Sequence, residues 1–403
     1  MYRTLFISLF ILLPIVSKAQ MSIKRTRFNG FIDTYHAVNN YQDFLSSRTR
    51  FRGEFKIGNS KSYLFTSFNL THNNLLKDET GIKLLEAFYS YKAKNINLKI
   101  GRQIIIWGVA DGLRITDKVS PMDYTEFLAR DYDDIRLAVD AFKFRYTKDN
   151  MKLDFVFIPI FESFNLPINK DNPWSIINPK LLNKYEVVDN KPKFKLDNSE
   201  LGIRLSYNLP GIDFSLSSLY TWNKIPIIRA SKVQDKMMII KDYKRMFFIG
   251  GDISKPMGEF VIRGEGAINF KKAFLTKTNN ILRKKSLEYL LGIDWYASNE
   301  WVFMCQYSNQ TILDYNKSMV CDKNMSLLTL NITKKIFNST TKLSDFTYYD
   351  INNNSSFSRF SIDYSLSDQL HFIAGYDCFI GDKGKFGLYK DNSEYWLKAK
   401  YTF

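Results

Sequence analysis

The sequence predicts an all-β fold, namely a transmembrane antiparallel up-and-down β-barrel of about 18 strands, with about 16 as the alternative. Three observations predict it. Apolar and polar residues alternate with period two along the chain after Gln20. Short connections between these segments alternate with long ones along the chain. Aromatic residues make up 16% of the chain although the mean hydropathy is −0.25, which suits strands with one lipid face and one water face.

The alternation is clearest in the second half of the chain. In residues 287–295 the odd positions are Leu, Tyr, Leu, Ile and Trp, while the even positions include Glu288 and Asp294. Residues 360–366 and 201–209 follow the same pattern. A soluble β-sandwich also alternates, so the loop pattern has to separate the two folds.

The expected strands are listed by residue number: 26–37, 48–57, 61–70, 83–93, 96–107, 136–147, 151–163, 199–209, 212–223, 244–255, 258–270, 286–297, 300–312, 325–337, 340–350, 355–366, 369–380 and 393–403. Short turns, such as residues 94–95 and 298–299, connect every second pair. Nearly all the others are longer, up to residues 163–198. Short turns at one end and long loops at the other are typical of an outer-membrane barrel.

The two ends of the chain agree with export to an outer membrane. Arg3, the apolar residues 5–16 and Ala19 predict a signal peptide over residues 1–19, too short to span a bilayer as a helix. Residues 20–403 then form a single transmembrane barrel domain. The last segment, SEYWLKAKYTF, ends on Phe403 and resembles the terminal strand through which the barrel assembly machinery recognises its substrates.

The connection at residues 101–136 is the most unusual one, because it carries charges of both signs. It holds seven carboxylates between Asp111 and Asp134. Ser120, Pro121 and Asp123 predict the start of a short helix, with Ser as the cap. A long, charged but partly apolar loop between two strands is usually functional. We expect it to fold inward and to narrow a pore.

The same stretch contains a motif that resembles one found in a known protein family. Gly101-Arg102-Gln103, Trp107-Gly108, Asp111, Pro121-x-Asp123 and Asp134-x-Arg136 resemble the motif of bacterial outer-membrane porin-like β-barrels. These include a large group of uncharacterised proteins and the alginate-export barrels, with a Gly-Arg-Gln strand before the loop. The resemblance implies a passive or substrate-tuned channel in the outer membrane of a Gram-negative cell.

The charges then suggest a mechanism of selection. The net charge of +16 fits a basic lumen, or a basic outer surface facing lipopolysaccharide and other outer-membrane lipids; nucleic acid is not an expected partner. Loop carboxylates at residues 108–135 would face wall arginines, and the field between them would orient small hydrophilic solutes, anions included. The expected pore lining and constriction are Arg50, Arg52, Arg102, Asp111, Arg114, Asp117, Asp123, Glu126, Arg130, Asp134, Arg136, Arg145 and Arg204. A kink near Gly101 would be needed to turn Arg102 inward.

Several alternatives stay open. Loop acids and wall bases could simply pair and fix the loop. A substrate-specific transporter or exporter, of oligosaccharide, polysaccharide or a hydrophobic compound, could use residues 163–198 as a lid or plug. Trimers are common among porins, but the sequence does not fix the oligomeric state.

Other chemistry has little support. Asp123, Asp131, Asp133 and Asp134 do not have the spacing of a calcium loop, so we expect no metal or cofactor. An enzyme would have to use His371 with Ser361 or Ser365, and no motif supports one. Cys305, Cys321 and Cys378 are expected to be unpaired.

Overall fold

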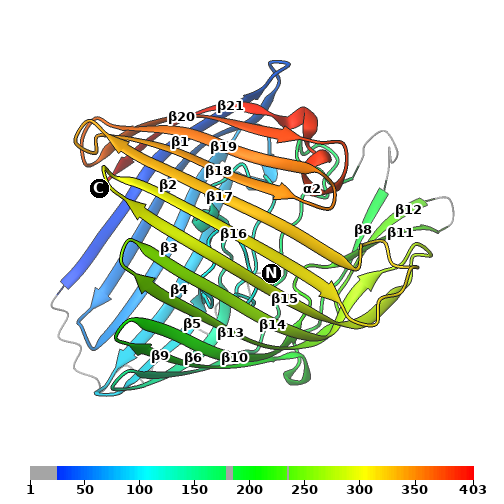
Figure 1. The fold of residues 1–403 in the computed structure, drawn as a ribbon, viewed down its shortest axis with the longest axis horizontal. Helices are drawn as coiled ribbons and strands as arrows, with labels where there is room; N and C mark the ends of the chain where they lie inside the picture. The colour runs from blue at the N-terminus through cyan, green and yellow to red at the C-terminus, as the bar shows by residue number, and fades with distance from the viewer. Residues whose placement is uncertain (1–24, 178–184, 234–235) are drawn as a thin grey trace.

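The computed structural model describes residues 25–177, 185–233 and 236–403, so the expected signal peptide lies outside the described residues. Eighteen strands form one sheet (Figure 1). They are β1 (Arg25–Asn39), β2 (Phe44–Gly58), β3 (Ser62–Asn73), β4 (Gly81–Lys92), β5 (Ile96–Gln103), β6 (Val139–Lys148), β7 (Met151–Ile158), β9 (Glu200–Leu209), β10 (Ile212–Trp222), β13 (Arg245–Met257), β14 (Phe260–Leu275), β15 (Ile281–Ala297), β16 (Trp301–Ile312), β17 (Asn324–Ile336), β18 (Thr341–Asp350), β19 (Ser355–Ser365), β20 (Leu370–Ile380) and β21 (Glu394–Thr402).

The sheet is closed and antiparallel. Each strand pairs with its neighbour along the ring, and β1 pairs with β21 from Phe31 opposite Thr402 to Asn39 opposite Glu394. Closure leaves no open strand edge, as a lipid environment requires. The predicted barrel of 18 strands is therefore confirmed, and the count of about 16 is wrong.

A second, smaller sheet was not predicted. β8 (Tyr185–Asn190) lies parallel to β12 (Lys236–Asp242), and β11 (Ile227–Val233) pairs with β12 on its other side. These strands belong to long loops and project beyond the barrel at the end opposite the short turns (Figure 1). We call the two ends of the barrel the short-turn end and the long-loop end.

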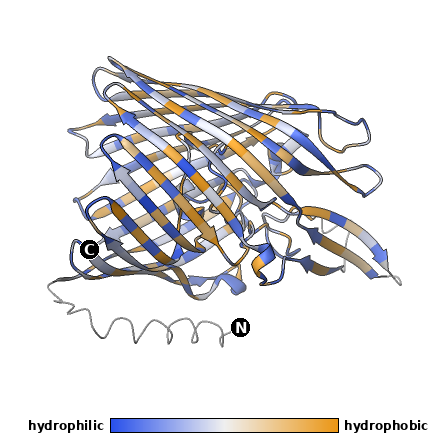
Figure 2. Cartoon of the chain, turned by 90° about the horizontal axis from the view of Figure 1, so that it is seen from below, coloured by the Kyte–Doolittle hydropathy of each residue, from blue (hydrophilic) through white to orange (hydrophobic). Residues whose placement is uncertain are grey.

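Hydrophobic and hydrophilic residues alternate along the strands, as expected (Figure 2). In β15, Ser286, Glu288 and Asp294 are buried, whereas Leu291 and Ile293 are exposed on the outer face. A Lys or Arg on the lipid face near the membrane midplane would cost about 2–4 kcal/mol. This penalty explains why the charged residues of the strands gather on the inner face.

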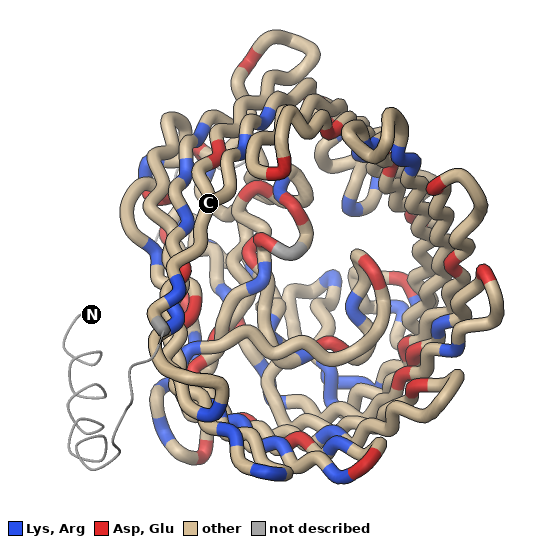
Figure 3. Tube along the Cα trace, turned by 90° about the vertical axis from the view of Figure 1, so that its left-hand side faces the viewer, with Lys and Arg blue, Asp and Glu red and all other residues tan. Residues whose placement is uncertain are grey.

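The space inside the barrel is partly filled by residues 104–138, which run between β5 and β6 (Figure 3). We call this segment the inner loop. Its Ile105, Trp107, Ile115 and Val119 pack against inward-facing apolar residues of the wall, Leu219, Phe248 and Leu290 among them. Further along, Ala129 packs with Trp174 and with Phe357 and Phe379 of the opposite wall. The inner loop therefore has an apolar core of its own inside the barrel.

Two smaller observations complete the fold. No helix in the described part of the chain has the length and apolar character needed to cross a membrane. Cys305, Cys321 and Cys378 are free, which confirms the expectation that they are unpaired.

Candidate functional site

The inner loop begins where the β5 ladder stops, four residues earlier than predicted. The Ile104 N–H donates to the Glu86 carboxylate at 2.8 Å, and the Ile105 N–H donates to the Ser120 hydroxyl at 2.9 Å. These side-chain acceptors replace the strand partners and lead the chain into the lumen. No helix begins directly after Ser120, so its hydroxyl serves this backbone contact and not a cap.

The predicted helix at Ser120 and Pro121 is accordingly wrong. Met122 forms an isolated antiparallel bridge with Arg136, and Asp123 forms a parallel bridge with Asn165. The inner loop does contain one short 3-10 helix in the described residues, η2 (Tyr132–Ile135), close to its return to the wall.

One buried carboxylate of β14 holds the first half of the inner loop. Glu265 accepts hydrogen bonds from the backbone N–H groups of Val109 at 2.5 Å, Ala110 at 2.7 Å and Thr116 at 2.9 Å, and from the Thr116 hydroxyl at 2.8 Å. Gly108 has a φ of 97°, and a Cβ there would lie 2.8 Å from the same carboxylate. The turn thus needs glycine to let the backbone approach Glu265.

The neighbouring wall strands continue this attachment. Gln306 of β16 accepts from the Asp111 N–H at 3.1 Å and donates to the Asp111 carbonyl at 2.7 Å. Tyr348 of β18 donates to the Gly112 carbonyl at 2.9 Å. Lys118 lies 2.7 Å from the carboxylate of Glu288 on β15. All these contacts fix the backbone of the inner loop or one of its cations to the wall.

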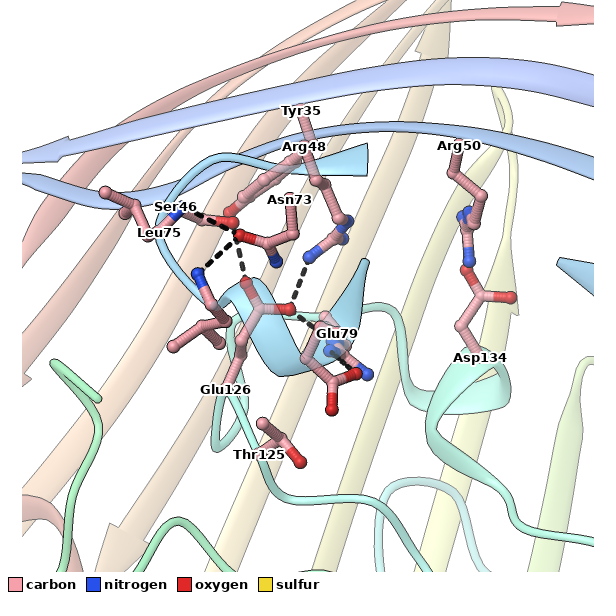
Figure 4. A network of polar contacts seen from close by, with 12 residues as sticks. Tyr35, Ser46, Arg48, Arg50, Asn73, Leu75, Glu79, Thr125, Glu126 and Asp134 are labelled. Atoms are coloured by element: carbon pink, nitrogen blue, oxygen red, sulfur yellow. Dashed lines mark hydrogen bonds and ion pairs between the residues drawn. The ribbon is translucent and has the colours of Figure 1, made fainter. Parts of the chain in front are cut away.

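The second half of the inner loop meets a ladder of arginines on β2. The Glu126 carboxylate accepts from Arg48 at 2.5 Å and from the Ser46 hydroxyl at 2.7 Å, and it also pairs with Arg130 (Figure 4). The side chain of Glu126 is 1% exposed. Burial alone would raise the pKa of Glu126, but the two guanidinium groups lower it to about 2. Glu126 is therefore ionised at neutral pH.

Asp134 bridges the next two arginines of the ladder. Its carboxylate lies 2.9 Å from Arg50 and 2.8 Å from Arg52. Burial alone would raise the pKa of Asp134, but the two arginines hold it well below its usual range. Arg50 also pairs with Asp33 of β1 at 2.5 Å, and Lys398 of β21 lies 2.6 Å from Asp131. The first and last strands of the barrel thus share the charges of the inner loop.

The two attachments lie on opposite sides of the barrel. Counted along the ring, β2 and β14 are nine strands apart in a sheet of 18. The inner loop is therefore fixed at diametrically opposed points of the wall and crosses the lumen between them, as the view from the short-turn end shows (Figure 3).

Some of the remaining charges pair within the loop, whereas Asp111 accepts from Asn331 of β17 at 3.5 Å and Arg130 also lies 3.7 Å from Glu79, between β3 and β4. Arg136 pairs with Asp117, whose carboxylate also lies 3.4 Å from Arg114. Arg130 lies 3.1 Å from Asp123. These pairs hold the inner loop in shape and do not reach the wall.

Three of the predicted arginines are not brought to the inner loop. Arg145 pairs with Asp154 of β7 at 2.5 Å, and Arg204 pairs with Asp252 of β13 at 3.0 Å. Arg102 lies 3.5 Å from Asp140, its register partner on β6. Gly101 has a φ of 124°, but the strand pairing continues through it without a register shift, and Arg102 is not turned toward the loop carboxylates. In each case a carboxylate on an adjacent or nearby strand lies closer to the arginine than any carboxylate of the inner loop does.

Sequence reasoning did not recognise the role of Glu265 and Glu288 in holding the inner loop. The register partner of Glu265 on β13 is Asp252, another acid, so no cation stands opposite it across that pair. Two acids side by side on the lumen face are a signal that some other group must compensate them. The compensating N–H groups lie about 150 residues away in sequence, at positions that no local pattern indicates.

The long connection after β7 packs against the inner loop on its long-loop side. The Tyr124 N–H donates to the Asn165 carbonyl at 2.8 Å, and Asn172 donates to the Thr125 carbonyl at 2.7 Å. Trp174 is fully buried, and Tyr389, which follows β20, donates to its carbonyl at 3.0 Å. Part of the connection that we expected to act as a lid or plug is thus joined to the inner loop.

The arrangement offers little to enzyme or metal chemistry. The Nδ1 atom of His371 lies 2.9 Å from Asp363 and 3.1 Å from Ser365. A serine triad needs the acid and the serine on different ring nitrogens, whereas here both lie on one. Among the described residues, no three His, Cys, Asp or Glu side chains are grouped to hold a metal ion.

Comparison with known proteins places the chain among porin-like barrels. The family described as "Protein of unknown function (DUF1302)" matches residues 24–403. OccK3 (OpdO) of Pseudomonas aeruginosa has a TM-score of 0.57 at 10% identity, covering 95% of this chain and 97% of that chain. OccAB3 of Acinetobacter baumannii has a TM-score of 0.55 at 10% identity, covering 94% and 100%. The outer membrane channel DcaP of the same organism has a TM-score of 0.47 at 10% identity, covering 94% and 97%. A search of the curated proteins finds no match. The fold is therefore that of the OccK3 and OccAB3 barrels.

Proposed function

The chain belongs to the DUF1302 family, and we propose that it is an outer-membrane porin-like channel for the passive diffusion of small hydrophilic solutes, anions included. One observation supports this most directly. The inner loop is fixed to β2 and β14, on opposite sides of the lumen, by Glu126 and Asp134 at one end and by Glu265 at the other. A segment held in this way narrows the path without closing the barrel as a separate plug domain would.

The charges at the β2 end favour anions modestly. Arg48, Arg50 and Arg52 share the inner wall with Lys398 and Lys400 of β21. Glu126, Asp131, Asp134 and Asp33 offset most of this charge through ion pairs. The remaining positive potential is small, so we expect a selective bias rather than exclusion of cations.

The test is the single-channel current of the mature protein refolded into a planar bilayer, with the reversal potential measured in a salt gradient. We expect steady conductance with an anion preference that weakens in Arg50→Ala plus Arg52→Ala. The matched control is Arg229→Ala, which removes an arginine paired with Asp242 in the small sheet outside the barrel. Absence of conductance in a barrel that shows heat-modifiable migration on a gel would overturn the proposal.

A substrate-specific transporter is the second candidate, and the packing of three long loops favours it. Phe127 of the inner loop lies 4.4 Å from the Tyr389 ring, and both rings pack with Trp174. Such an aromatic cluster on the long-loop side could hold the path shut until a substrate binds. A folded barrel that conducts only after a particular solute is added would support this candidate over the open channel.

A further inference from the structure

A cavity of about 360 Å³ lies between the inner loop and strands β9, β10, β13 and β14. Val109 of the inner loop contributes to its lining, together with Arg204, Asp252 and Arg263 of the wall. Its volume is at the lower end of the range of about 300–1,000 Å³ that is typical of small-molecule sites. None of the constriction residues of β2 lines it.

The polar groups around this cavity are held in place. Arg204 donates through Nε to the Ser215 hydroxyl at 3.0 Å and through Nη2 to the Asp252 carboxylate at 3.0 Å. Arg263 donates through Nη1 to the Val109 carbonyl at 2.9 Å and pairs with Asp294. The cavity is therefore preorganised by its own wall, and Arg263 ties the inner loop to it.

Both cations of the cavity are already neutralised. Each guanidinium has a carboxylate partner, and both partners are almost fully buried, with side-chain exposures of 4% for Asp252 and 1% for Asp294. Asp213, also in the lining, adds one more carboxylate, which accepts a hydrogen bond from Asn208 at 2.9 Å. An anion entering the cavity would gain little Coulomb energy there and would lose hydration.

Hydrogen-bonding capacity is nevertheless left over. Within the described part of the chain, the hydroxyls of Ser206 and Ser254 and the Nη1 atom of Arg204 have no hydrogen-bond partner, and all three residues line the cavity. One oxygen of Asp213 is likewise available as an acceptor. Donors and acceptors are thus interspersed over a small surface that carries no excess positive charge.

We propose that this cavity binds a neutral, hydroxyl-rich solute of the saccharide class as it passes through the lumen. Each hydroxyl of such a solute both donates and accepts, so it can use Asp213, the two serines and Arg204 together. The inference rests on the proposed function, because the solute is taken to reach the cavity through the channel. It adds a substrate class to that function and a site other than the β2 constriction.

The test compares two solutes that share a disaccharide-derived skeleton. Lactitol is neutral, whereas lactobionate carries a carboxylate in place of one CH₂OH group. Binding is measured by calorimetry on the full mature protein in detergent, and interruption of the ionic current by the same solutes is measured in bilayers. The variant is Arg204→Met with Asp252→Asn, which removes one ion pair at constant net charge. The control, Arg145→Met with Asp154→Asn, removes a comparable pair that does not line the cavity.

We expect the wild type to bind lactitol saturably and more tightly than lactobionate. Lactitol binding should be about tenfold weaker in the Arg204 variant and unchanged in the Arg145 control. Lactitol binding by a folded protein that does not conduct would uphold the site while removing the channel. The inference would be overturned, and the channel left in place, by any of three results. These are conductance without lactitol binding, tighter binding of lactobionate than of lactitol, and an equal loss of lactitol binding in both double variants.

Discussion

Glu126 is the residue at which the charges of the inner loop and the wall meet most tightly. It is almost fully buried and receives hydrogen bonds from Arg48, Ser46 and Arg130. A buried carboxylate without partners would be strongly destabilising, whereas a paired one is tolerated. The pairing therefore explains how an acid can lie inside an apolar and basic surrounding, and it makes the inner loop dependent on that acid.

Glu126→Gln is expected to destabilise the protein by about 3 kcal/mol, because Arg48 and Arg130 would lose the charge that compensates them. The folded-state pKa of Glu126, about 2, is below its unfolded value, so its contribution is present above the unfolded pKa and is lost as the pH falls through about 2. The measurement is urea unfolding of the wild type and of Glu126→Gln in detergent, from neutral pH down to about pH 2.

The difference in unfolding free energy between the wild type and Glu126→Gln should stay constant from neutral to mildly acidic pH and then decline. Asp131 and Asp134 also titrate in acid, but they are present in both proteins, so the difference isolates Glu126. A difference that is already absent at neutral pH would show that the ion pairs of Glu126 do not stabilise the fold.

At the scale of elements, the strands and the inward fold of the loop could be predicted, whereas the course of the inner loop could not. In β15 most of the exposed residues between Leu287 and Trp295 are apolar, and the buried Ser286, Glu288 and Asp294 are polar, because lipid lies on one side and the lumen on the other. This information is local, so the alternation with period two was sufficient to predict the strands. The course of the inner loop instead depends on Glu265, Gln306 and Tyr348, which lie far away in sequence.

The same reasoning explains which of the predicted arginines lie next to acids of the inner loop. Arg50 and Arg52 were expected to face loop acids, and both lie next to Asp134. Arg145 and Arg204 were expected there too, but Arg145 pairs with Asp154 on the adjacent strand and Arg204 pairs with Asp252 two strands away. Alternation gives the face of a residue but not the position of its partner around the ring. The small sheet of β8, β11 and β12 was missed because its segments lie in loops that we took to be irregular.

Glu265→Gln tests the attachment of the inner loop to β14. A glutamine side chain presents an N–H₂ group to the three N–H donors of Val109, Ala110 and Thr116, so at least one buried donor loses its acceptor, at a cost of about 1–3 kcal/mol. We expect faster hydrogen exchange over residues 105–116 and larger open-channel current noise. Glu259→Gln, at a turn near Trp295, is the control. Unchanged exchange would mean that apolar packing alone holds the inner loop.

At the scale of the whole molecule, the barrel depends on the seam between its first and last strands. Gly30 and Phe403 exchange two backbone hydrogen bonds of 3.0 Å each. The Phe403 ring lies 5.5 Å from Phe28 and 5.9 Å from Phe51, centroid to centroid. The terminal residue thus joins an aromatic cluster on β1 and β2 while it closes the ring. Its recognition by the barrel assembly machinery stays a prediction.

Gly30→Ala should weaken this seam. A Cβ at Gly30 would lie 2.2 Å from the Arg52 carbonyl oxygen and 2.9 Å from the Phe403 ring. Because the carbonyl belongs to the backbone of the paired strand, it cannot move aside, and we expect a loss of about 1–3 kcal/mol from overpacking. Closure joins the first strand to the last, a contact of the largest sequence separation, so the substitution should also slow refolding.

Gly266→Ala is the matched control, since a Cβ at Gly266, on β14, would meet nothing within 4 Å. Refolding of both variants into lipid vesicles is followed by the appearance of the heat-modifiable band, and stability is followed by urea unfolding. If closure at Gly30 and Phe403 limits assembly, Gly30→Ala refolds slowly and unfolds early, while Gly266→Ala follows the wild type. Equal behaviour of the two variants would show that the ring closes elsewhere first and that the seam tolerates a displaced Phe403.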